Sequence, residues 1–81
     1  MRFELYTDAA LTRDISEHNL RRGDVVKVVD HHSSPNGQNG YSIEVFNAIG
    51  DTIAVTAVPE SALEPLHKDE VLSVRAFTAV K

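Results

Sequence analysis

The chain has 81 residues, of which 42% are hydrophobic and 25% charged. A chain of this length forms one small domain with a modest core, and its ordinary composition excludes wholesale disorder. It contains no cysteine, which excludes disulfides and thiolate metal sites. A domain this small without such cross-links depends on close packing or on a partner subunit.

The formal net charge is −4, and the eight basic residues are scattered, with only Arg21 and Arg22 adjacent. Proteins that bind nucleic acid neutralise phosphates with clustered Lys and Arg, so nucleic acid is an unlikely class of partner. The first residues lack the apolar core of a signal peptide, and no apolar run approaches the roughly 20 residues of a membrane span. We therefore expect a cytoplasmic protein that does not contact membranes.

The first 20 residues fit two interpretations. Five apolar residues fall on odd positions, as in strands interrupted by a kink: Phe3, Leu5, Ala9, Leu11 and Ile15. Asp8 could instead cap a helix in which Leu11 and Ile15 are i,i+4 neighbours. Alternation favours the strand.

Three segments between residues 24 and 58 predict an antiparallel meander. The first, residues 24–30, is rich in valine, which favours strands. Residues 41–46 alternate, so we expect Tyr41, Ile43 and Val45 to face inward. After a turn at residues 47–51, residues 52–58 form a third strand, in which Ile53, Val55 and Ala57 share a face.

Between the first two of these strands lies "DHHSSPNGQNGY", residues 30–41. Adjacent histidines suggest a metal site, but in a strand His31 and His32 point to opposite faces and no His-x₃-His spacing occurs. The glycines lack the Lys-Ser/Thr of a phosphate-binding loop, and no helix follows. Asn-Gly pairs close hairpins. We expect a long, mobile hairpin loop with solvated histidines, and no metal or cofactor.

Residues 58–66, "VPESALEPL", differ from a strand because two prolines leave room for about one helical turn. This pattern predicts a 3₁₀ turn around residues 60–62 and a short strand near Leu63.

The carboxyl-terminal stretch, residues 69–81, is too apolar for a solvent-exposed segment that contacts nothing. Three interpretations remain open: a sixth strand within the monomer or across a dimer, a segment that docks on another chain, or a helix, which the Val and Thr content disfavours. We expect residues 69–80 to be ordered. Val74, Arg75 and Phe77 are the predicted partner-binding residues.

The order of these pieces resembles a family of small uncharacterised bacterial proteins, catalogued as a domain of unknown function. The resemblance is carried by "DAALTRDI", "NLRRGDVVKVVD", "YSIEVFNAIGDTIAVTAV" and "SALEPL". It departs from the family in the length of the loop at residues 30–40 and in Val26, where glycine is common. The resemblance implies an SH3-like β-barrel and, for some members, a neighbouring partner gene in a toxin–antitoxin-like pair. It implies no catalytic residues.

We therefore predict an all-β, SH3-like domain spanning residues 1–81, with about five barrel strands over residues 3–66 and an extension at 67–81. No Gly-x-Ser-x-Gly motif or deep cleft indicates an enzyme. The leading hypothesis is a non-enzymatic module that binds another protein chain, self or heterologous, as the antitoxin-like partner of a two-gene pair. The alternative is an RNA- or ribosome-binding barrel, suggested by "RRGDVVKVV". Clustered Arg21, Arg22, Lys27 and Arg75 would favour RNA; an exposed apolar face around Phe77 would favour protein.

Overall fold

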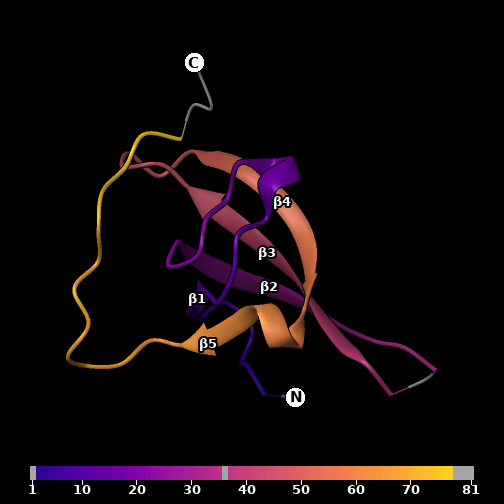
Figure 1. The fold of residues 1–81 in the computed structure, drawn as a ribbon. Coiled ribbons are helices and arrows are strands. Elements are labelled where there is room, and N and C mark those ends of the chain that lie inside the picture. The colour runs from indigo at the N-terminus through magenta and orange to yellow at the C-terminus, as the bar shows by residue number, and fades with distance from the viewer. Residues whose placement is uncertain (1, 36, 78–81) are drawn as a thin grey trace.

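The computed structural model describes residues 2–35 and 37–77, and its strands form one antiparallel sheet (Figure 1). The strands are β1 (Asp8–Leu11), β2 (Val25–Ser33), β3 (Asn39–Phe46), β4 (Thr52–Pro59) and β5 (Leu63–Pro65), in the spatial order β4-β3-β2-β1-β5. Two 3₁₀ turns, η1 (Ser16–His18) and η2 (Glu60–Ala62), complete the fold. The all-β prediction is confirmed, with the 3₁₀ turn directly before the last strand.

The curved sheet encloses its core on one face, and the inner residues follow the alternation of the strands. Val26 and Val28 of β2 are buried, as are Tyr41, Ile43 and Val45 of β3. These strands lie side by side, with Val28 opposite Ile43. The inward face predicted for residues 41–46 is therefore confirmed.

Val55 and Ala57 of β4 share a face, as predicted, and that face points away from the core. Val45 pairs with Ala54, Ile43 with Thr56 and Tyr41 with Val58. Residues opposite each other in a ladder point to the same face, so Ala54, Thr56 and Val58 of β4 face the core. Val55 is consequently 58% exposed. A bulge between Val45 and Phe46 shifts the pairing register by one residue near the start of β4, at Ile53. The sequence pattern did not indicate this shift.

Near the amino terminus the strand interpretation is correct over Asp8–Leu11, because β1 pairs with both β2 and β5. The chain then turns through η1, and Ile15 forms an isolated bridge with Leu20. Asn19 ends η1 in the left-handed conformation, with φ of 59°. Asparagine tolerates this conformation better than most residues.

The long loop predicted at residues 30–40 is largely strand. β2 continues to Ser33 and β3 begins at Asn39, so residues 34–38 form a connection of ordinary hairpin length. His31 lies opposite Tyr41 and is partly buried, with 5.1 Å between the two ring centroids. Only His32 is exposed as expected. A bulge between Val28 and Asp30 shifts the register by one residue, so that His31 faces inward like Val26 and Val28 before the bulge.

Tyr41 connects three parts of the fold through its buried hydroxyl. The backbone N–H groups of Arg2 and Phe3 donate to it at 3.0 and 3.3 Å, and the hydroxyl donates to Glu60 at 3.2 Å. Its ring packs edge-on against Phe3, with centroids 5.4 Å apart. One side chain thus fastens the amino-terminal segment and η2 to β3.

The expected sixth strand is not formed in residues 66–77. β5 has three residues and ends at Pro65, which has no N–H for a further ladder bond. The yellow segment in Figure 1 instead leaves β5 and runs along the outside of the fold toward the turn between β3 and β4. Of the predicted ordered stretch at 69–80, residues 78–80 lie outside the described part of the chain.

Candidate partner-binding site

The site starts at a tight turn, residues 21–24, immediately before β2. The Asp24 N–H donates to the Arg21 carbonyl at 3.0 Å, and Gly23 has φ of 91°. A type II turn requires positive φ at its third residue, which glycine adopts without steric cost. The Arg21 N–H in turn donates to the Asp24 carboxylate at 2.8 Å. Residues 21–24 thus form a turn that fixes the position of the Asp24 side chain.

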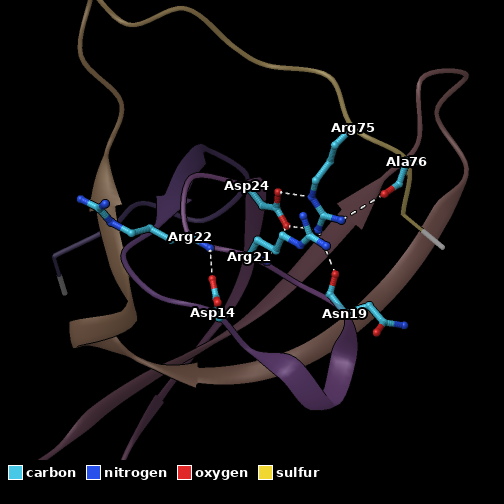
Figure 2. Close-up of polar contacts among 7 residues, drawn as sticks. All are labelled: Asp14, Asn19, Arg21, Arg22, Asp24, Arg75 and Ala76. Atoms are coloured by element: carbon cyan, nitrogen blue, oxygen red, sulfur yellow. Dashed lines mark hydrogen bonds and ion pairs between the residues drawn. The ribbon is translucent and has the colours of Figure 1, made fainter. Parts of the chain in front are cut away.

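The carboxylate of Asp24 is held by Arg75, from the carboxyl-terminal segment (Figure 2). Arg75 donates from Nε to Oδ1 at 2.9 Å and from Nη2 to Oδ2, a bidentate pairing with the geometric specificity of guanidinium for carboxylate. Nη2 also donates to the Asn19 carbonyl at 2.9 Å, and Nη1 to the carbonyl of Ala76 at 3.1 Å. The guanidinium therefore joins the carboxyl-terminal segment, residues 66–77, to the turn and to the end of η1. We call this segment the tail.

The pair is partly shielded from water, with 17% of the Asp24 side chain and 26% of the Arg75 side chain exposed. Burial by itself raises the pKa of Asp24. The hydrogen bond from Arg75, the Arg21 N–H and the positive charges of both arginines outweigh it, so the pKa lies below its ordinary value. The hydrogen bonds that Arg75 donates to Asp24 raise the pKa of Arg75 above its ordinary value.

Beside this pair the tail and the sheet enclose a groove of about 350 Å³, which we call the tail groove. The tail provides residues 72–75 and Phe77. The rest of the fold provides Asp24, Val25 and the end of β3 with the following turn, residues 45–48. Phe77 packs partly buried against the core, whereas Leu72 is 61% and Val74 97% exposed. The groove thus has an apolar lining, an ion pair in its wall and an apolar rim open to solvent.

All three predicted partner-binding residues line the tail groove, but they play different parts there. Val74 points into solvent, Phe77 anchors the tail on the core, and Arg75 is paired within the chain. Sequence reasoning missed Asp24, Asn19 and Phe46. The charge of Asp24 was visible, but nothing in a single sequence connects it to a residue 51 positions away.

A comparison with protein families identifies residues 5–65 as a match to the domain of unknown function DUF4926. The chain belongs to this family. No curated protein and no solved structure shows significant similarity to it. The match ends at Pro65, the last residue of β5, so the turn that carries Asp24 lies within the DUF4926 region and Arg75 lies beyond it.

Four cations of this DUF4926 domain were named as a possible RNA surface: Arg21, Arg22, Lys27 and Arg75. Lys27 pairs with Asp8 at 3.3 Å, and Arg75 pairs with Asp24. The Arg22 side chain extends away from the Asp24–Arg75 pair in Figure 2, while its backbone N–H donates to Asp14 at 2.9 Å. Two of the four cations named as a possible RNA surface are thus neutralised by aspartates.

The histidines are dispersed over the domain. His18 lies 3.0 Å from the Thr56 hydroxyl, and His32 lies 2.7 Å from the Ser42 hydroxyl. A serine–histidine contact becomes catalytic when a third group orients the imidazole. Within residues 2–35 and 37–77, no carboxylate forms an ion pair with His32, and no three potential ligands group into a metal site.

Over the same described ranges, none of the helical segments has the length and apolar character to cross a membrane.

Proposed function

We propose that the DUF4926 domain is a non-enzymatic protein-interaction module, built as an SH3-like barrel, and that it binds another protein chain at the tail groove. The observation that carries the proposal is the apolar rim formed by the tail. Val71, Leu72 and Val74 are 92%, 61% and 97% exposed within four residues of a segment without regular secondary structure. Leu72 and Val74 line the groove together with Phe46, which is 39% exposed.

Single exposed apolar residues are ordinary on protein surfaces, whereas several gathered beside a groove mark an interaction site. Burying a large apolar side chain contributes about 1.5–3 kcal/mol. A partner that covered Leu72, Val74 and Phe46 would therefore gain several such contributions. The neutralised Asp24–Arg75 pair in the wall adds no net charge for the partner to desolvate.

An RNA-binding function is less well supported. It would need a surface of free cations, but Lys27 and Arg75 are each paired with an aspartate, and the whole chain carries −4. Long-range attraction to phosphate is weak for such a protein.

The resemblance to small bacterial proteins supports a narrower form of the proposal. In that form the protein is cytoplasmic and is the small, antitoxin-like partner of a two-gene pair. The groove on the tail side would then hold the product of the neighbouring gene.

Site-specific photo-crosslinking in the source cells tests the proposal. A photoreactive amino acid replaces Leu72 at the groove rim, and the matched control carries it in place of Val55, which is 58% exposed on β4 outside the groove lining. We expect a discrete protein adduct from position 72 and none of that mass from position 55. Equal yields of one adduct from both positions, or adducts with RNA alone, would contradict the proposal.

A further inference from the structure

The tail is attached to the rest of the fold mainly through side chains. Within the described residues, its one backbone–backbone hydrogen bond is local, from the Glu70 N–H to the His67 carbonyl at 3.0 Å. The contacts that hold its far end are the Arg75 guanidinium on Asp24 and Asn19, and the Phe77 ring on the core. A segment held in this way can leave the groove without breaking a β-ladder.

We infer that residues 71–77 are an exchangeable segment, and that the Asp24 turn and the core surface under Phe77 of one molecule bind the same segment of a second copy. This inference goes beyond the proposed function, because exchange rebuilds the tail groove between two molecules and leaves its apolar rim open to a partner. The second copy is indicated by the structure itself, since the surface that the tail covers is complementary to the tail in charge, at Asp24, and in shape, at the site of Phe77.

The connection to β5 is long enough for exchange. Nine residues, 66–74, separate Pro65 from Arg75, and an extended chain spans at most about 3.3–3.6 Å per residue, so the connection reaches roughly 30 Å. The described fold measures 40 × 30 × 21 Å in its principal extents. Two molecules whose grooves face each other could therefore each place Arg75 on the partner's Asp24.

Exchange creates no new type of contact, because each groove keeps one arginine, one aspartate and one phenylalanine. A molecule's own tail competes at an effective concentration of about the millimolar range expected for a short flexible linker. We therefore expect the unaltered protein to be monomeric at micromolar concentration. Exchange becomes dominant when a molecule's own tail no longer fits its own groove.

Charge reversal produces that situation. In Asp24→Arg, two arginines meet within one molecule; in Arg75→Asp, two aspartates meet. When the two variants are mixed, reciprocal exchange pairs opposite charges in both grooves. We expect an equimolar mixture to form a heterodimer at micromolar concentration by light scattering, while each variant alone, and the double variant Asp24→Arg/Arg75→Asp, stays monomeric. A mixture that stays monomeric although the double variant is as stable as the unaltered protein would overturn the inference.

Cysteine trapping provides a second readout that does not place like charges together. The chain has no cysteine, so the full-length variant Asp24→Cys/Arg75→Cys has only the introduced pair. We expect a bis-maleimide crosslinker about as long as the arginine side chain to yield linked monomers at micromolar concentration and a rising share of linked dimers toward millimolar concentration, with Asp24→Cys/Ile49→Cys as the control for random collision. Monomers alone at every concentration would refute exchange but leave the groove available to a different protein. Failure to link even within one molecule would refute the tail contact on which both proposals depend.

Discussion

Arg75 holds both carboxylate oxygens of Asp24, although 51 positions of sequence separate the two residues. The aspartate belongs to the turn that leads into β2, and the arginine to a segment that follows the last strand. This pairing gives the tail a defined position without hydrogen bonds of a strand. It thereby shapes the tail groove, which neither the sheet nor the tail forms alone.

The Asp24–Arg75 pair makes stability depend on pH in the acid range. Because the pKa of Asp24 is lower in the folded protein than in the unfolded chain, its ionised form stabilises the fold above the ordinary pKa of 3.8. This stabilisation is lost as the pH falls through the folded pKa. We expect the difference in free energy of unfolding between the unaltered protein and Asp24→Asn to become smaller as the pH falls from 3.8 through the pKa of Asp24 in the folded protein. Urea unfolding at a series of pH values measures it, and a difference that does not change between neutral pH and the acid range below 3.8 would be inconsistent with the pair.

Hydrogen exchange distinguishes a tail held by side chains from a tail held in a strand. The amides of residues 71–76 make no backbone–backbone hydrogen bond within the described structure, so we expect them to exchange at nearly the rates of an unfolded peptide. The amides of Val28 and Ile43, in central strands, should be strongly protected. Protection of alternate tail amides would show instead that the tail adds to a sheet.

The Tyr41 hydroxyl offers a test of the fold that is independent of the tail. Tyr41→Phe removes the acceptor of two backbone N–H groups and the donor to Glu60, without changing the packed ring. We expect a loss of about 1–2 kcal/mol in the free energy of unfolding, because the Phe3 N–H is left buried and unsatisfied. Tyr6→Phe is the matched control, since Tyr6 is 69% exposed. Equal effects of the two substitutions would contradict the described network.

We expect nucleic-acid binding to be weak and not to depend on a defined site of the protein. Lys27 and Arg75 are paired with aspartates, and the chain carries a net charge of −4. We therefore expect dissociation constants for generic RNA no tighter than roughly 10⁻⁵ M at physiological salt. Fluorescence anisotropy with labelled RNA measures this. A micromolar or tighter, salt-dependent interaction that Arg21→Glu/Arg22→Glu abolishes would favour the RNA-binding alternative.

Much of the fold could be predicted because local patterns and tertiary structure agree. The alternation of Tyr41, Ile43 and Val45 identified the inner face of β3, and Pro59 and Pro65 limited η2 to one turn. Which face of β4 lies inward could not be predicted, because the segment is apolar on both faces and a bulge shifts its register by one residue.

The candidate site was predictable only in part. The apolar content of the tail indicated that it contacts something, and Val74, Arg75 and Phe77 do line the groove. The position of the tail could not be predicted, because it depends on a pairing between distant residues rather than on local propensity. His31 is a similar case, since the bulge after Val28 turns it toward Tyr41.

Both proposals require that Asp24 and Arg75 together hold the tail at the groove, and a double-mutant cycle tests this requirement most directly. The free energies of unfolding of Asp24→Asn, Arg75→Gln and the double variant are compared with that of the unaltered protein at neutral pH. For a bidentate, partly buried pair we predict a coupling free energy of about 1–2 kcal/mol, and a loss on combining the two substitutions that is smaller than the sum of the single losses. Strictly additive losses, with coupling near zero, would show that the two side chains do not interact in solution and would contradict the account.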